Sequence, residues 1–283
     1  MGTQRRADRA AVRGHVRDQR DRLTALVDAV AADEPDSVHR MRVAARRLRS
    51  VIGTYPSVFP APAADPLRDE LRWLGTVLGR ARDAEVLADR FGEVLDALPP
   101  ELLRGPVRFR LVDEHRRRYR DAHTAAVTAV TGPRYRALVD GLDVLCATTA
   151  SGGRPRNELR HARRRVLRAG RSAGLRDGAA PGPPDALHTT RKRAKALRYA
   201  AEAIAAARPG TARLGEAAER LQTVLGAHQD AVVARAVLLA AADRARAAGE
   251  DTFSYGVLAA GEITRAERTA ADARPVLAAI DDL

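Results

Sequence analysis

Two sequence motifs each occur twice in this chain of 283 residues, in the same order and at nearly the same spacing. The segment SVHRMRVAARRLRSVIGTY (37–55) aligns with ALHTTRKRAKALRYAAEAI (186–204). The segment LRWLGTVLGRARDAEVL (71–87) aligns with AERLQTVLGAHQDAVVA (218–234), and the letters TVLG recur unchanged. Two motifs rarely repeat in one order by chance, so we expect an internal duplication.

The duplication predicts two homologous halves, residues 1–150 and 157–283, which together form one domain from about residue 6 to residue 280. The corresponding residues are His39 and His188, Arg42 and Arg191, Arg46 and Lys195, Arg49 and Arg198, and Asp83 and Asp230. We expect the halves to join near residues 151–157, where glycine, proline and polar residues cluster.

Apolar residues recur at helical spacing between proline- and glycine-rich breaks, which predicts an all-α fold. Aromatic residues make up only 4% of the chain, so the core must be built mainly from Ala, Leu and Val. Helices are expected at 6–32, 36–55, 65–98, 101–130, 134–148, 157–172, 184–207, 211–248 and 252–282. Asp65, followed by Pro66, and Asp185 are expected to begin helices.

The first motif concentrates basic residues on one face of its helix. At about 100° per residue, an arc about 80° wide contains His39, Arg42, Arg46 and Arg49. The neighbouring arc is an apolar seam that should pack on another helix, and it contains Met41, Ala45, Leu48, Ile52 and Tyr55. Arg40 and Arg47 fall outside the basic arc and are expected to be ordinary solvated charges.

The second copy has the same pattern. Its basic arc contains His188, Arg191, Lys195 and Arg198, and its seam contains Thr190, Ala194, Leu197 and Ala201. Glu202 lies one turn beyond Arg198, so it is expected to pair with Arg198 or with Lys195.

Each basic stripe places four like charges along about 15 Å of helix, where they repel one another. Either internal acids or an external polyanion neutralises these charges. Asp83 and Asp230 are available as internal acids, and each is expected to orient arginines or to cap a turn. Arginines at one-turn spacing suit a repeated phosphate ligand, because each guanidinium forks onto phosphate oxygens. The alternative is that both stripes are salt-bridged seams of a helical bundle.

The net charge of +13 and the isoelectric point near 11.0 indicate an anionic partner, such as nucleic acid, an anionic membrane or polyphosphate. Codon bias in a GC-rich genome would also raise the arginine content, so the arginine count alone does not indicate binding. The single cysteine, Cys146, excludes an internal disulfide. The N-terminal segment lacks an apolar signal core, and the longest apolar run (231–242) is too short to span a bilayer. We therefore expect a cytoplasmic protein without membrane insertion.

The pair VHxxRVAxRRLR and LHxxRKRxKxLRYxxE, each followed by LGxxxD, resembles the CHAD family, the conserved histidine α-helical domain. The resemblance covers about residues 6–280. It implies two homologous four-helix bundles related by a pseudo-two-fold axis, with a central basic cavity where the histidine helices meet. It also implies binding of inorganic polyphosphate and association with polyphosphate granules. The implied binding residues are His39, Arg42, Arg46, Arg49, His188, Arg191, Lys195, Arg198 and Tyr199.

Other basic segments add candidates for polyphosphate binding. Arg82 lies in LGRARD, the first copy of the glycine–aspartate motif, whereas the second copy, LGAHQD, has no arginine. The run DEHRRRYRDAH (113–123) and the run RHARRRVLRAGR (160–171) place arginines along helical stripes. Their candidates are Arg116, Arg120, Arg164 and Arg168.

The sequence thus predicts a non-catalytic polyphosphate-binding protein that needs no cofactor and has no metal site. It contains no Walker A, GxSxG or HExxH motif. Two alternatives stay open. One is sequence-independent nucleic-acid binding through phosphate contacts, against which the scarcity of aromatic residues argues. The other is an enzyme of phosphate metabolism that uses His39 or His188. Protein partners are not predicted.

Overall fold

The computed structural model describes residues 2–148, 153–175 and 182–283. Within these ranges the protein is all-α, as the sequence predicts, and no residue lies in a strand. The α-helices are α1 (Gly2–Ala25), α2 (Val27–Ala31), α3 (Ser37–Thr54), α4 (Ala61–Asp96), α5 (Glu114–Thr131), α6 (Pro133–Ala147), α7 (Pro155–Ser172), α8 (Pro184–Ile204), α9 (Ala212–Ala247) and α10 (Phe253–Asp281). The predicted boundary at residue 150 and the start of the predicted junction at 151–157 lie outside the described residues.

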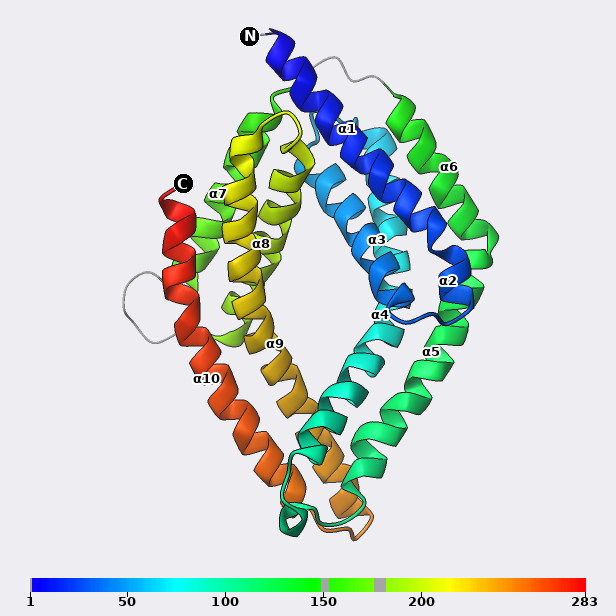
Figure 1. The fold of residues 1–283 in the computed structure, drawn as a ribbon, viewed down its shortest axis with the longest axis vertical. Coiled ribbons are helices and arrows are strands. Elements are labelled where there is room, and N and C mark those ends of the chain that lie inside the picture. The colour runs from blue at the N-terminus through cyan, green and yellow to red at the C-terminus, as the bar shows by residue number, and fades with distance from the viewer. Residues whose placement is uncertain (1, 149–152, 176–181) are drawn as a thin grey trace.

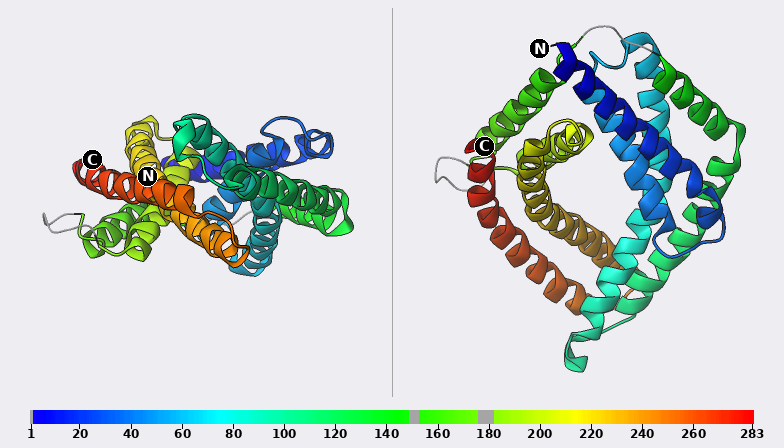
Figure 2. Two further views of the ribbon diagram at one scale, coloured as in Figure 1. Left: turned by 90° about the horizontal axis from the view of Figure 1, so that it is seen from below. Right: turned by 45° about the horizontal axis from the view of Figure 1, so that its top comes forward.

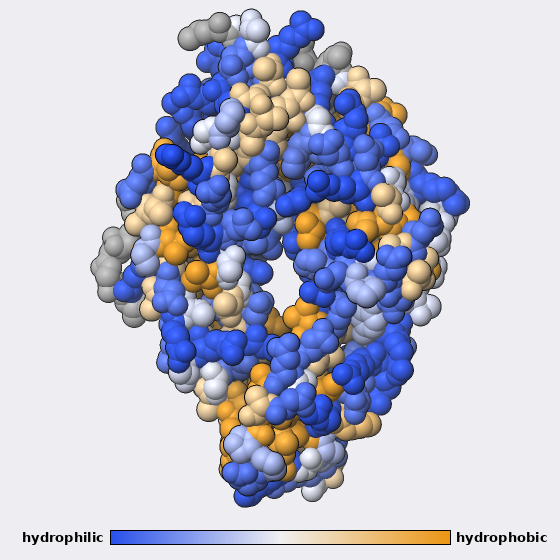
Figure 3. Space-filling model, viewed as in Figure 1, coloured by the Kyte–Doolittle hydropathy of each residue, from blue (hydrophilic) through white to orange (hydrophobic). Residues whose placement is uncertain are grey.

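The helices are arranged as an elongated ring (Figure 1). Helices α1 to α6 form one side, α7 to α10 form the other, and the two sides meet at both ends of the long axis (Figure 2). At one end α3 packs against α8, and at the other the segment preceding α5 packs against α9. Side chains do not fill the centre of the ring. The space-filling view shows an opening there, bordered mainly by hydrophilic residues (Figure 3).

Two clusters of buried apolar side chains stabilise the two ends of the ring. The larger cluster includes Leu48 of α3 and Leu197 of α8. The smaller cluster joins Phe91 of α4 to Leu238 of α9 and Tyr255 of α10. Each cluster takes residues from both sides of the ring, so burial of apolar surface holds the two sides together.

The apolar seams predicted for the two motif helices are buried. The seam residues Met41, Ala45, Leu48, Ile52, Tyr55, Thr190, Ala194, Leu197 and Ala201 are each at most 1% exposed. The spacing of three and four residues between them explains this, because it keeps them on one face of each helix. The basic stripe beside each seam is therefore held next to the core.

The N-terminus of α4 differs from the sequence prediction. The helix begins at Ala61 rather than near residue 65, and Pro66 lies inside it. Pro62 occupies the first turn, where a proline loses no helical hydrogen bond. Asp65 and Pro66 therefore do not begin the helix, because the proline-rich segment before them is already helical. The start predicted at Asp185 is confirmed to within one residue, because α8 begins at Pro184 and Asp185 lies in its first turn.

The helix expected at 101–130 is also divided. Gly105 has a φ of 69°, a left-handed conformation that glycine adopts without strain, and a Cβ there would lie 3.0 Å from the Asp251 carbonyl oxygen. After this turn, a single π-helical segment (Phe109–Asp113) leads into α5. The helix expected at 6–32 is likewise two helices, α1 and α2.

By length and composition alone, the helical segment Pro209–Ala247, which includes α9, is long and apolar enough to cross a bilayer. The apolar run noted in the sequence, at 231–242, is by itself too short to do so. Helix α9 packs along α8 and α10. Its side chains Leu221, Leu225 and Leu238 are each at most 1% exposed. These side chains place one face of α9 in the core, although only 39% of its apolar window is buried.

A buried ion pair links the two sides of the ring between α4 and α10. Arg90 Nη2 lies 2.5 Å from Glu262 Oε2, and Arg90 Nε lies 3.2 Å from Glu262 Oε1. The Glu262 side chain is only 8% exposed. A charge at this depth needs its partner, because few water molecules reach it.

Replacing Arg90→Leu is expected to lower the free energy of unfolding by about 3 kcal/mol, because the buried carboxylate of Glu262 loses its partner. The double variant Arg90→Leu/Glu262→Leu is expected to regain most of that stability. Urea unfolding followed by circular dichroism measures both changes. A double variant as unstable as the single one would contradict the ion-pair explanation.

Candidate functional site

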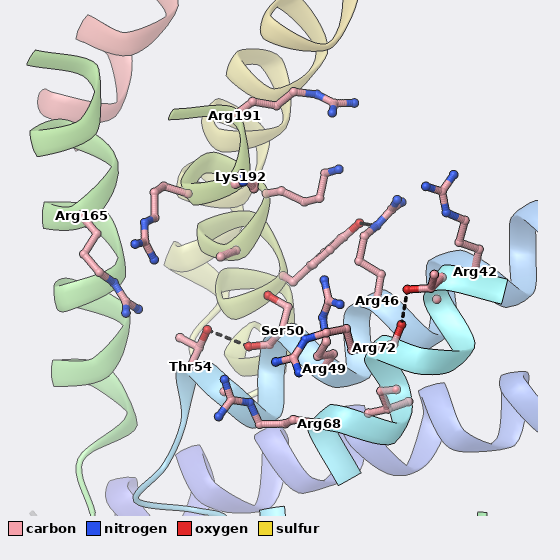
Figure 4. A pocket seen from close by; sticks show the side chains of 18 of the residues that line it. Arg42, Arg46, Arg49, Ser50, Thr54, Arg68, Arg72, Arg165, Arg191 and Lys192 are labelled. Atoms are coloured by element: carbon pink, nitrogen blue, oxygen red, sulfur yellow. Dashed lines mark hydrogen bonds between the residues drawn. The ribbon is translucent and has the colours of Figure 1, made fainter. Parts of the chain in front are cut away.

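A cavity of about 610 Å³ lies between α3, α4, α7 and α8 (Figure 4). Its basic side chains are Arg42, Arg46 and Arg49 of α3, Arg68 and Arg72 of α4, Arg165 of α7, and His188, Arg191, Lys192, Arg193 and Lys195 of α8. Of the described residues that line it, none carries a carboxylate. The cavity therefore concentrates positive charge in a confined space, where it attracts polyanions strongly.

Three carboxylates beside the cavity wall each hold one of its arginines. Asp83 Oδ1 accepts a hydrogen bond of 3.0 Å from Arg42, which confirms the prediction that Asp83 orients an arginine. On α4, Asp65 accepts from Arg68 at 2.7 Å and Asp69 accepts from Arg72 at 2.6 Å. These acids fix guanidinium positions, while the lining itself stays cationic.

Hydrogen bonds between the α3 segment and α8 hold six of the eight stripe residues, all but His39 and Arg198, around one cavity. Tyr55 Oη donates to the Ala200 carbonyl oxygen at 2.6 Å, and Arg46 Nε donates to Tyr199 Oη at 3.1 Å. Both bonds cross from one side of the ring to the other. The repeated motifs therefore meet at this contact.

Arg47 does not behave as the sequence predicts. It is only 19% exposed, lies 3.3 Å from Glu202, and its guanidinium carbon is 5.5 Å from the centre of the Tyr199 ring. Helical phase alone predicts a solvated charge here, but α8 covers the face of α3 on which Arg47 lies. Arg40 is 52% exposed, in agreement with the prediction.

Burial and mutual repulsion lower the pKa values of three cavity residues. Burial, followed by the charges of Arg46 and Arg191, lowers the pKa of Lys195 to about 7. Burial also lowers the pKa of Arg191, and burial with the charges of Arg72 and Arg46 lowers the pKa of Arg49. Burial and neighbouring charges thus disfavour the positive charge on these groups, and an anion bound beside them would offset that cost.

The glycine–aspartate motif has a physical role in both halves. A Cβ on Gly79 would lie 3.5 Å from Arg42 Nη2, and a Cβ on Gly226 would lie 3.5 Å from Arg191 Nε. In both copies the guanidinium of the neighbouring motif helix is thus close to the glycine, at a distance where a Cβ would make an ordinary van der Waals contact. The aspartate four residues later is near that guanidinium, since Asp83 bonds Arg42 and Asp230 counteracts the lowered pKa of Arg191.

The cavity is lined by seven of the residues that the sequence proposes for binding, namely Arg42, Arg46, Arg49, His188, Arg191, Lys195 and Tyr199. Arg82 and Arg198 lie outside it and are paired with acids. Arg82 bonds Glu85 at 2.8 Å, and Arg198 bonds Glu202 at 2.7 Å, which is one of the two pairings expected for Glu202. The exposed residues Arg116 and Arg120 of α5 and Arg164 and Arg168 of α7 also lie outside the cavity lining.

His39 lines a different pocket, of about 560 Å³, between α1 and α3. Gln19, Arg22, Leu26 and Val43 are also part of this second pocket. Burial, followed by the charge of Arg82, lowers the pKa of His39. His39 therefore does not share the cavity with His188, although the two residues correspond in the aligned motifs.

Five basic lining residues are not predicted from the sequence: Arg68, Arg72, Arg165, Lys192 and Arg193. Arg68 and Arg72 lie one turn apart on α4, and this spacing was the available signal. Arg165 adjoins the predicted Arg164, but α7 carries arginines on several faces, so the sequence did not indicate which face meets the cavity. No group of three or more His, Cys, Asp or Glu side chains in the described ranges is placed to hold a metal ion.

Two curated relatives come from Mycobacterium tuberculosis. They are the uncharacterized protein Rv2226 of strain H37Rv and the uncharacterized protein MT2285 of strain CDC 1551 / Oshkosh. Each is 43% identical to this chain over 260 residues, which are 89% of this chain and 50% of the relative. The chain thus spans about half the length of the curated relatives it matches.

Two solved structures share the fold. The crystal structure of the CHAD domain from the plant Ricinus communis has a TM-score of 0.74 and 26% sequence identity, over 97% of this chain and 92% of the other. PptA from Streptomyces chartreusis has a TM-score of 0.72 and 20% identity, over 97% of this chain and 99% of the other. At that identity the second likeness concerns the fold alone.

A family model described as CHAD domain matches residues 14–239, which is most of the chain. This match and the plant CHAD structure confirm the resemblance carried by the histidine and glycine–aspartate motifs. The chain belongs to the CHAD domain family.

Proposed function

We propose that this protein binds inorganic polyphosphate, without catalysis, in the cavity between α3, α4, α7 and α8. The observation that carries the proposal is a lining of ten arginine and lysine side chains with no carboxylate among its described members. The cavity cations lie close together and partly buried, so a ligand with many negative charges at short, regular intervals stabilises their charged state most. A linear polyphosphate is such a ligand, and membership of the CHAD family supports the same assignment.

Binding in this cavity would use guanidinium groups from both sides of the ring. Arg46 and Arg49 on α3 and Arg191 on α8 are partly buried, which makes each hydrogen bond to a phosphate oxygen stronger than on an open surface. Tyr199 is the one aromatic residue among the described lining residues, and its hydroxyl already accepts from Arg46. The lining thus offers phosphate contacts and little surface for base stacking, which favours polyphosphate over nucleic acid.

We also propose that the two sides of the ring arose by duplication and are related by a pseudo-two-fold axis through a central basic cavity. The equivalent contacts of Gly79 with Arg42 and of Gly226 with Arg191 support this. Helices α4 and α9, which carry these glycines, are each 36 residues long. The proposed setting is the cytoplasm, in association with polyphosphate granules.

Long-chain polyphosphate is expected to outcompete duplex DNA at physiological salt, with each polymer measured in phosphate units. A fluorescently labelled polyphosphate followed by anisotropy provides the measurement. Displacement of polyphosphate by DNA at a comparable phosphate concentration would contradict the proposal.

Sizing the polyphosphate after incubation with Mg²⁺ and nucleotides tests the absence of catalysis, and shortened or extended chains would indicate an enzyme.

The double variant Arg49→Gln/Arg191→Gln is expected to bind polyphosphate about 100-fold more weakly, because each charge-assisted contact contributes about 1.5–3 kcal/mol. It is also expected to unfold at higher temperature, since it relieves repulsion between buried cations. The matched control is Arg265→Gln/Arg268→Gln, which removes the same charge from exposed positions on α10. Equal losses of affinity in the two variants would show that net charge, and not the cavity, governs binding.

Polyphosphate affinity is expected to fall about tenfold between pH 7 and pH 8.5. Free Lys195 has a pKa of about 7, and a bound polyanion raises that pKa, so binding takes up a proton above pH 7. The charges acting on Lys195 are Arg42 and Arg46 of α3, Arg191 of α8 and, in the opposite direction, Asp230 of α9. Lys195→Arg is expected to flatten this dependence in titrations across the same pH range. An unchanged slope in that variant would contradict the assignment to Lys195.

A further inference from the structure

The chain contains only two lysines, and both lie on α8 and line the cavity. Lys192 is exposed, whereas Lys195, almost one turn later, is partly buried. Among the described residues, no carboxylate forms an ion pair with Lys195, and its neighbours in the cavity are the guanidinium groups of Arg46 and Arg191. Lys195 is therefore an amine that opens into a phosphate-attracting space without an acid to hold its proton.

This environment makes Lys195 nucleophilic near neutral pH. Its pKa of about 7 leaves about half of the amine unprotonated at that pH. An ordinary lysine at pH 7 has fewer than about one neutral amine in a thousand. Only the neutral amine has the lone pair that attacks a carbonyl carbon.

The same arginines that surround this amine would orient one class of reagent. A small acyl phosphate carries a phosphate group, which guanidinium groups bind through paired hydrogen bonds. Binding the phosphate beside Arg46 and Arg191 brings the adjoining carbonyl carbon near the amine, which converts a bimolecular reaction into a local one. We infer that Lys195 is a modification site at which small acyl phosphates transfer their acyl group to the amine.

The reaction is a simple acyl transfer. The Lys195 Nζ lone pair forms a bond to the carbonyl carbon, and the bond from that carbon to the phosphate oxygen breaks. The bonding electrons leave with inorganic phosphate, whose developing charge the arginines stabilise. The amine loses one proton, which the departing phosphate accepts. The product is an uncharged amide, and no oxidant or metal is required.

The regulatory consequence rests on the proposed function. Acylated Lys195 cannot take up a proton, so the cavity loses one cation permanently. Polyphosphate affinity at pH 7 is expected to fall about tenfold, and its dependence on pH above 7 is expected to disappear. A bound polyphosphate would in turn protect Lys195, because it occupies the arginines and keeps the amine protonated.

The test is incubation of the full chain with acetyl phosphate at pH 7.5, followed by peptide mass spectrometry of both lysines. Lys195 is expected to be acetylated at least about tenfold faster than Lys192. Tripolyphosphate is expected to suppress the reaction at Lys195. Acetylation by p-nitrophenyl acetate, which has no phosphate group, is the control reaction, and tripolyphosphate should slow it less.

The variant Arg46→Gln/Arg191→Gln separates reagent binding from amine reactivity. It is expected to slow acetylation of Lys195 by acetyl phosphate more than that by p-nitrophenyl acetate. Equal rates at Lys192 and Lys195, or no protection by tripolyphosphate, would overturn the inference. Polyphosphate binding measured on the same protein distinguishes the outcomes. Binding without acetylation refutes the modification site alone, whereas acetylation with phosphate protection but no polyphosphate binding refutes the proposed function alone.

Discussion

The contact between α3 and α8 is the constraint on which the site depends. Two apolar seams and two tyrosines hold these helices together. The same contact places most residues of their basic stripes around one cavity. The favourable term is burial of apolar surface, which is large and insensitive to charge. The unfavourable terms are the burial of these cations and, after it, their mutual repulsion, and both lower the pKa values of Arg49, Arg191 and Lys195. The fold therefore carries electrostatic strain that an anionic ligand would relieve.

The far end of the ring is stabilised by contacts that do not involve the cavity cations. These contacts are a separate apolar cluster and the ion pair between Arg90 and Glu262. Acids behind the cavity wall, such as Asp83, hold individual arginines without entering the lining. This arrangement fixes the directions of the guanidinium groups before any ligand arrives, and such preorganisation lowers the entropic cost of binding.

Helical phase is enough to predict the buried seams of the two motif helices and the six stripe residues that line the cavity. It is not enough to predict which helix covers each face, because that depends on contacts between segments far apart in the sequence. Arg47 was misassigned for this reason, since it meets Glu202 across the ring. His39 lines a pocket with α1 for the same reason. The rule that proline breaks or begins a helix also fails at α4, because Pro62 lies in the first turn and Pro66 lies inside the helix.

The central claim is that a polyanion occupies the cavity between α3 and α8, not the basic outer faces of the ring. A crystal structure of the protein with a polyphosphate of defined length tests it most directly. Phosphate groups should lie against Arg46, Arg49 and Arg191. Ordered phosphates along Arg116 and Arg120 of α5, or Arg164 and Arg168 of α7, with none in the cavity, would contradict the claim.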